Sequence, residues 1–125
     1  MKMFHIESSQ NSPDVRIDGQ DGIMEISGNS TFERPNDFYR QVARWVHAFH
    51  KDAKEIQTVN VKFSELDKAS IRWMMFLLKE VEKISSDRNN MVVVNWYYNG
   101  NNESVRSTGE NCKSQVKLPF NLIAA

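Results

Sequence analysis

Residues 91–98 read Met-Val-Val-Val-Asn-Trp-Tyr-Tyr, an apolar, β-branched and aromatic run broken by a single amide. Such a run is typical of a strand in the interior of a sheet. Upstream, Val59, Val61 and Phe63 alternate with polar residues, which predicts another strand. A helical pattern separates the two, so we expect a right-handed parallel crossover from residue 59 to residue 98.

Two amphipathic helices are predicted, one before and one after the strand at residues 59–63. Pro35 opens one helix over residues 35–51, in which Phe38, Val42 and Trp45 lie on one apolar face. Asp67 is a good N-cap for the second helix, whose wide apolar stripe includes the pair Met74-Met75. That pair predicts either a gap-filling core or an adaptable docking surface, and the core is the simpler explanation.

The remaining segments predict further strands of the same sheet and a third helix. Val15 and Ile17 alternate with charges, and a turn at residues 19–22 leads to a returning strand at 23–27. Residues 1–12 are expected to form a loose arm or a short edge element. Residues 102–115 suggest a third helix weakened by Gly109, and residues 116–120 a last edge strand. We therefore predict one α/β domain over residues 1–125, with a mixed sheet of four to five strands and two to three helices.

Composition excludes several classes of function. The 125 residues balance 16 Lys and Arg against 16 Asp and Glu, which argues against a basic nucleic-acid or membrane-surface footprint. The single cysteine rules out an internal disulfide, and no apolar run approaches the roughly 18 residues of a membrane span. The N-terminus lacks the apolar core of a secretory signal. We expect a soluble, cytoplasmic protein.

Candidate chemical groups are sparse. His47 and His50 have a spacing that two metal ligands use on a helix, but no third ligand is evident, so a solvated helix flank is the expectation. Cys112 has no neighbouring base and is expected to be a surface or half-buried thiol. The aromatics from Trp96 to Tyr98 suggest a stacking platform for nucleic acid, although alternating strand faces explain them more simply. We predict no catalytic residue, no metal site and no cofactor.

Several of these strings together carry a resemblance to a known family. The chain resembles the SiaC family of bacterial regulatory phosphoproteins, whose fold is similar to that of the STAS anti-sigma-factor antagonists. The resemblance runs from Ser12-Pro13 to Pro119-Phe120. It is carried by Gly28-Asn29-Ser30, Gln41-Val42, Trp45-Val46, Ser70-Ile71-Arg72, Met74-Met75, Val94-Asn95-Trp96-Tyr97-Tyr98, Gly109-Glu110 and Leu118-Pro119-Phe120.

The resemblance implies partner switching by a protein that is not itself an enzyme. Such proteins are substrates of a serine/threonine kinase and a phosphatase, and their unphosphorylated form activates a diguanylate cyclase in cyclic-di-GMP and biofilm control. The family's acceptor is a threonine at the start of the second helix. Here Lys68 occupies that position, and Ser70 is the remaining hydroxyl of the motif.

The expected partner-binding residues are Asp67, Lys68, Ser70, Arg72 and Trp73, with Ser70 as a possible acceptor and Asp67 as the helix cap. Lysine at position 68 leads us to expect a protein held in its partner-binding form. Two alternatives remain open. One is an anti-sigma-factor antagonist that docks on a kinase-like protein, and the other is a small-molecule or lipid-binding domain with a cavity beneath the Met-rich helix.

Overall fold

The structure, a computed structural model, describes residues 3–31, 35–52, 56–88 and 91–125. Six strands and three helices follow one another in these ranges. Their order is β1 (Met3–Ile6), β2 (Asp14–Asp18), β3 (Ile23–Ser30), α1 (Asn36–Asp52), β4 (Thr58–Leu66), α2 (Lys68–Arg88), β5 (Val93–Tyr98), α3 (Glu103–Gln115) and β6 (Phe120–Ala124). None of the helices in the described ranges is both long and apolar enough to cross a bilayer.

All six strands form one mixed sheet in which the spatial order equals the chain order, from β1 to β6. The pairs β1–β2 and β2–β3 are antiparallel, and the pairs from β3 to β6 are parallel. The predicted parallel pairing of β4 with β5 is confirmed. Each parallel step requires a crossover connection, and α1, α2 and α3 supply the three crossovers.

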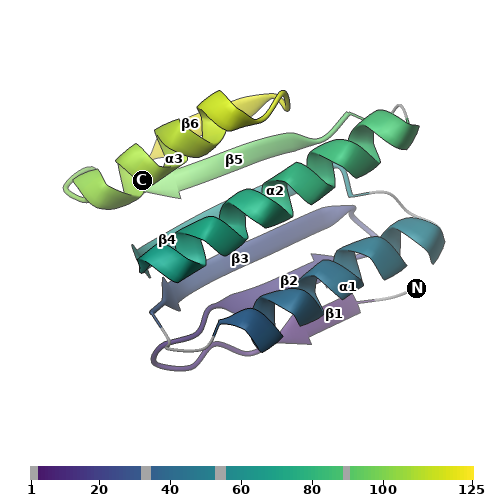
Figure 1. Cartoon of the computed structure of the whole chain (residues 1–125), viewed down its shortest axis with the longest axis horizontal. Coiled ribbons are helices and arrows are strands. Elements are labelled where there is room, and N and C mark those ends of the chain that lie inside the picture. Colours follow the sequence, from purple (N-terminus) through teal and green to yellow (C-terminus); the bar gives the residue numbers. More distant parts are fainter. Residues whose placement is uncertain (1–2, 32–34, 53–55, 89–90) are drawn as a thin grey trace.

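The helices cover only one face of the sheet, with α1 in front of β1 and β2 and α3 in front of β5 and β6 (Figure 1). The strand order explains this arrangement. Because parallel crossovers have a fixed hand, strands added always in the same direction place every connecting helix on the same side. The opposite face is open and polar, with a row of paired amides in which Asn95 donates to Asn60 and accepts from Asn121.

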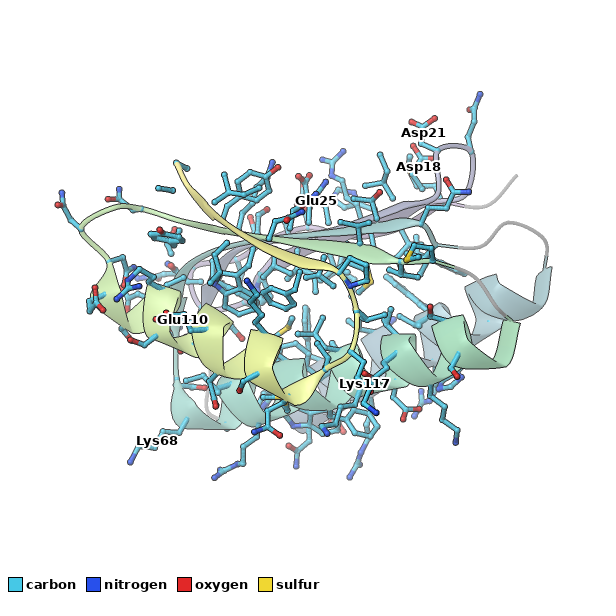
Figure 2. All side chains as sticks on the ribbon, turned by 90° about the horizontal axis from the view of Figure 1, so that it is seen from above. Asp18, Asp21, Glu25, Lys68, Glu110 and Lys117 are labelled. Atoms are coloured by element: carbon cyan, nitrogen blue, oxygen red, sulfur yellow. The ribbon has the colours of Figure 1, made fainter. Side chains whose placement is uncertain are left out.

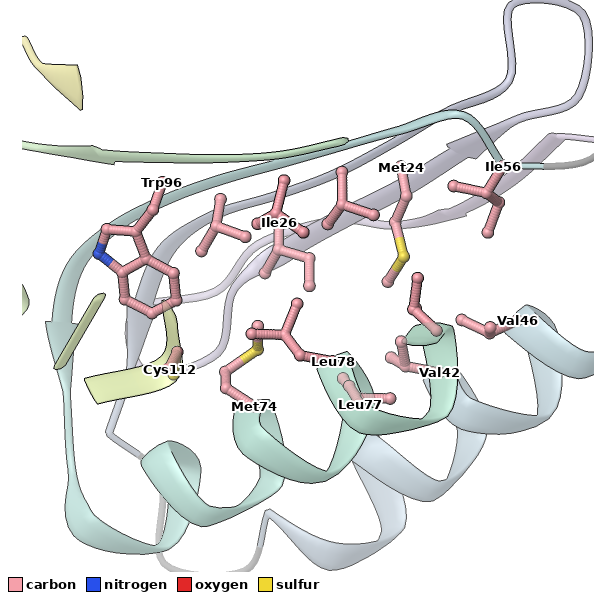
Figure 3. Close-up of a cluster of buried hydrophobic side chains, with 14 of the residues drawn as sticks. Met24, Ile26, Val42, Val46, Ile56, Met74, Leu77, Leu78, Trp96 and Cys112 are labelled. Atoms are coloured by element: carbon pink, nitrogen blue, oxygen red, sulfur yellow. The ribbon is translucent and has the colours of Figure 1, made fainter. Parts of the chain in front are cut away.

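The core lies between the sheet and the helices (Figure 3). Trp96, Ile26 and Met24 reach down from the strands to meet Met74 and Leu78 of α2, and all five side chains are buried. The Met-rich face of α2 therefore packs against the sheet, which confirms the gap-filling explanation for Met74. This packing leaves the alternative of a ligand cavity beneath α2 without support.

The structure corrects the expected number of strands and the bounds of the last strand. It has six strands and not four to five, because Met3–Ile6 pairs with β2 at the edge of the sheet. Of the two possibilities expected for residues 1–12, the short edge element is the one that forms. The last strand begins at Phe120, after Pro119, and does not span residues 116–120. The third helix does form over Glu103–Gln115, capped by Asn102, whose side chain accepts from the Val105 amide at 3.1 Å.

Gly109 is required in α3 despite its low helix propensity. A Cβ atom at this position would lie 2.5 Å from Cδ1 and 2.5 Å from Nε1 of Trp96. The indole is held in place because its Nε1 donates to the carbonyl of Val105 at 3.0 Å. The helix crosses so close to the buried Trp96 that only glycine fits.

Candidate functional site at the start of α2

The start of α2 is fixed by an aspartate cap, as the sequence predicts. The Asp67 side chain accepts from the Ser70 amide at 2.8 Å, and its backbone carbonyl accepts from the Ile71 amide. Its own amide donates to the carbonyl of Ser30 at 3.0 Å, which ties the cap to the end of β3. The cap therefore satisfies free N–H groups of the first turn and anchors the helix to the sheet.

The alternation of faces along β3 brings Ser30 to this position. The register between β3 and β4 shifts between Gly28 and Asn29, passing over one residue of β4, and Gly28 has a φ of 107°. Glycine adopts this conformation without strain. Ser30 lies on the same face of β3 as Met24 and Ile26, and it is fully buried beneath the first turn of α2.

Three buried hydroxyl groups join the elements around this turn. The Ser30 hydroxyl oxygen lies 2.6 Å from the Tyr39 oxygen and 2.6 Å from the Ser70 oxygen, and none of the three residues has exposed surface. Burial raises the pKa of Tyr39 to about 12, although its hydrogen bonds to the two serines oppose the rise. The phenol therefore stays protonated and links α1 to both β3 and α2.

This network corrects the expected role of Ser70. A residue that touches a partner or accepts a phosphoryl group has to be accessible, and the Ser70 side chain is completely enclosed. Its hydroxyl serves the interior instead. The sequence gives no sign of this, because the hydrogen-bond partner Ser30 lies 40 residues away along the chain.

Lys68 has the opposite environment. It is the first residue of α2, it is exposed, and no other described residue forms an ion pair with it. Figure 2 shows Lys68 at the outer side of the helical layer, pointing into solvent. A cation at the positive end of a helix is locally unfavourable, and no acidic residue occupies the first turn.

Beside Lys68, aromatic side chains line a shallow hollow of about 290 Å³ between α2 and the start of α1. Trp73 forms its floor, stacked on Tyr39 at a centroid distance of 6.0 Å and held by a 2.9 Å hydrogen bond from its Nε1 to Asn36. Phe76 stands against the indole edge at 5.4 Å and is 45% exposed. Arg72, also exposed, completes the rim.

The structure therefore brings four of the five predicted residues to one surface. Asp67, Lys68, Arg72 and Trp73 lie together on the first two turns of α2, whereas Ser70 faces inward. Sequence reasoning missed Phe76 as part of this surface. Its spacing of three from Trp73 was a usable signal, since residues three apart share a helix face.

The other candidate groups are not drawn into this site. His47 lies on the solvated flank of α1, where its Nε2 is 2.9 Å from a carboxylate oxygen of Glu80. The side chain of His50 lies outside the described residues. Among the described residues, no three His, Cys, Asp or Glu side chains are grouped as metal ligands.

Two further expectations concern Cys112 and the strand aromatics. Cys112 is fully buried, not a surface or half-buried thiol, and burial raises the pKa of its thiol to about 11. A protonated, enclosed thiol is not a nucleophile. Trp96 points into the core while Tyr97 lies on the opposite face of β5, which matches alternating strand faces and argues against a stacking platform.

Comparison with known proteins assigns the chain to a family. Residues 6–125 match the model of the SiaC family regulatory phosphoproteins. The chain belongs to this family. A relative, an uncharacterised protein of Pseudomonas aeruginosa strain UCBPP-PA14, is 28% identical over 120 residues, which are 96% of this chain and 94% of the relative.

Solved SiaC structures show the same architecture. Apo-SiaC from Pseudomonas aeruginosa superposes with a TM-score of 0.88 at 26% identity, covering 99% of this chain and all of that one. A chain in the structure of the diguanylate cyclase SiaD with its activator SiaC, from the same organism, matches with a TM-score of 0.87 at 27% identity. That match covers 98% of this chain and 99% of the other. The expected α/β architecture of the SiaC family is thereby confirmed.

Proposed function

We propose that this chain is a non-enzymatic regulator that binds and activates a diguanylate cyclase, and that the cyclase docks on the first two turns of α2. Membership in a family of regulatory phosphoproteins supports this role, as does the similarity to an activator seen in complex with a cyclase. The proposed setting is the cytoplasm, where a cyclase finds its nucleotide substrate.

The observation that carries the proposal is the pairing of an exposed cation with an exposed aromatic hollow at a rigid helix start. Lys68 and Arg72 supply unpaired positive charge, and Trp73 supplies a fixed apolar surface. Aromatic and arginine side chains in such positions are the usual energetic centres of protein interfaces. Asp67 keeps the surface in place by capping the helix.

Position 68 also decides how the activator is regulated. In the family, a kinase and a phosphatase act on a threonine at this position, but a lysine side chain accepts no phosphoryl group from a serine/threonine kinase. Ser70 is enclosed, so it offers no substitute in this conformation. We propose that the chain stays in the partner-binding form that unphosphorylated relatives adopt.

Binding of a SiaD-like diguanylate cyclase tests the proposal. We expect wild-type protein to bind the cyclase and raise its rate of cyclic-di-GMP synthesis. Lys68→Glu, which places a negative charge where the family carries phosphate, should weaken binding. Lys113→Glu, at an exposed lysine on α3, is the matched control. Equal affinity of Lys68→Glu and wild type would contradict the proposed surface.

A further inference from the structure

The exposed face of α2 carries positive charge beyond the docking surface as well as within it. Lys68, Arg72, Lys79 and Lys83 are all exposed, and their spacing of four, seven and four residues places them in one line along the helix. We call these four residues the cationic row. At a rise of 1.5 Å per residue the row extends for about 22 Å.

No other described residue forms an ion pair with any member of the cationic row. The three carboxylates adjacent to the row in sequence are engaged elsewhere. Asp67 accepts from the Ser70 amide, Glu80 contacts His47, and Glu82 accepts from the backbone amide of Lys117. Like charges four residues apart, as at Lys79 and Lys83, destabilise a helix slightly. No ion pair within the described residues offsets this repulsion. Unfavourable local charge of this kind is typical of functional surfaces.

The protein as a whole has no net charge, so the row is a local excess of positive charge on one helix face. Figure 2 shows Lys68 on the helical side of the molecule, and on the opposite side Glu25, which pairs with Lys62. A neutral chain can therefore present a positive helix face to an approaching partner. Such a face steers an oppositely charged surface during association.

An apolar line runs beside the cationic row. Ala69, Trp73 and Phe76 are spaced four and three residues apart, and they line the hollow described above. Glu80, the next residue along this side of the helix, is charged and contacts His47 of α1. A partner segment that lies along α2 thus meets an apolar hollow on one side and regularly spaced cations on the other.

From this juxtaposition we propose that the docking surface extends over four turns of α2 and takes an acidic amphipathic helix of the cyclase. One apolar side chain of that helix fills the hollow, and its carboxylates face the cationic row. An amphipathic helix offers both features at matching spacing, whereas a phosphate backbone offers charge alone. The inference rests on the proposed function, because it specifies the chemistry of that same partner.

Lys83 provides a selective test, since it lies at the far end of the row from Lys68. The dissociation constant of the SiaD-like cyclase is measured for wild type, Lys83→Glu and Lys113→Glu at low and high salt. The two substitutions change the charge equally on exposed helical sites. We expect Lys83→Glu to weaken binding by about tenfold at low salt, with a smaller difference at high salt, and Lys113→Glu to change it by less than about twofold.

A second variant tests the hollow separately from the charges. Phe76→Ala should weaken binding to a similar extent at both salt concentrations, because it removes apolar contact and no charge. Equal effects of Lys83→Glu and Lys113→Glu would overturn the extended surface. If Lys68→Glu still weakened binding in that case, the proposed function would stand alone. If the cyclase did not bind at all, both would fall.

Two other acidic probes complete the design, namely duplex DNA and vesicles containing phosphatidylserine. We expect neither to bind with an affinity that depends on Lys83. Binding of either probe that is lost in Lys83→Glu, with cyclase binding unaffected, would assign the cationic row to another class of partner and overturn the inference.

Discussion

Aspartate substitutions at positions 68 and 70 should have opposite consequences, although the two residues are neighbours in one helical turn. Ser70→Asp places a carboxylate in a site with no exposed surface, against the Ser30 hydroxyl. The Asp67 carboxylate, which already accepts from the amide of residue 70, adds repulsion. Lys68→Asp places the same group in solvent at the positive end of the helix, where an acid is favourable.

The expected magnitudes differ clearly. An uncompensated buried charge costs about 3–5 kcal/mol, and the Ser30 hydroxyl can offset only part of this with a hydrogen bond. We expect Ser70→Asp to lose about 3 kcal/mol of unfolding free energy at neutral pH. Lys68→Asp should stay within about 1 kcal/mol of wild type, because helix-terminal charges at exposed sites contribute about 0.3–1 kcal/mol.

Urea unfolding followed by tryptophan fluorescence measures both variants, and a pH series gives a further check. Burial raises the folded-state pKa of the new carboxyl at position 70 above its unfolded value of about 3.9. Its destabilisation is therefore complete above the raised pKa and disappears as the pH falls towards about 3.9. A Ser70→Asp protein within about 1 kcal/mol of wild type at neutral pH would refute the buried hydroxyl network.

Three further predictions concern the interior. Gly109→Ala should lose about 1–2 kcal/mol, because the clash with Trp96 costs more than the gain of roughly 1 kcal/mol in helix propensity. Gly100→Ala, with no atom within 4 Å of the new Cβ, should be close to neutral in the same urea titration, and equal stabilities would contradict this packing. Cys112, buried and with its pKa raised to about 11, should react with a thiol reagent at pH 8 only as fast as the protein unfolds, and rapid stoichiometric labelling would be the contrary result. Tyr39 has a folded pKa of about 12 against an ordinary value of 10.0, so its contribution to stability is present below pH 10 and is lost as the pH rises towards 12. Tyr39→Phe should show a flatter alkaline stability profile, and a profile as steep as that of wild type would exclude this assignment.

Much of the fold follows from local patterns in the sequence. Alternation at Val59, Val61 and Phe63 and the run that ends in Tyr98 predict two paired parallel strands, because the pattern of burial follows the period of a strand. The sequence alone does not distinguish the edge strand β1 from a loose arm. Phe4 and Ile6 alternate with exposed residues, but four residues are too few to separate from a polar arm.

In the candidate site, too, the features that depend on local contacts are predictable and those that depend on distant residues are not. The Asp67 cap depends on a contact three residues away, and the sequence predicts it correctly. The enclosure of Ser70 depends on Ser30 of β3 and Tyr39 of α1, which the fold brings together from distant parts of the chain. Net charge was equally uninformative about the cationic row, because a sum over the chain does not report where the charges lie.

We propose that this SiaC-family chain activates its cyclase constitutively because Lys68 occupies the position of the family's acceptor threonine. The most direct test compares the rate of cyclic-di-GMP synthesis by the SiaD-like cyclase, with wild-type protein or Lys68→Thr as activator, before and after treatment with the family kinase and MgATP. We predict that kinase treatment leaves activation by wild type unchanged and removes activation by Lys68→Thr, which alone gains the mass of a phosphoryl group. Loss of activation by kinase-treated wild-type protein, or no activation by untreated wild type, would contradict the account.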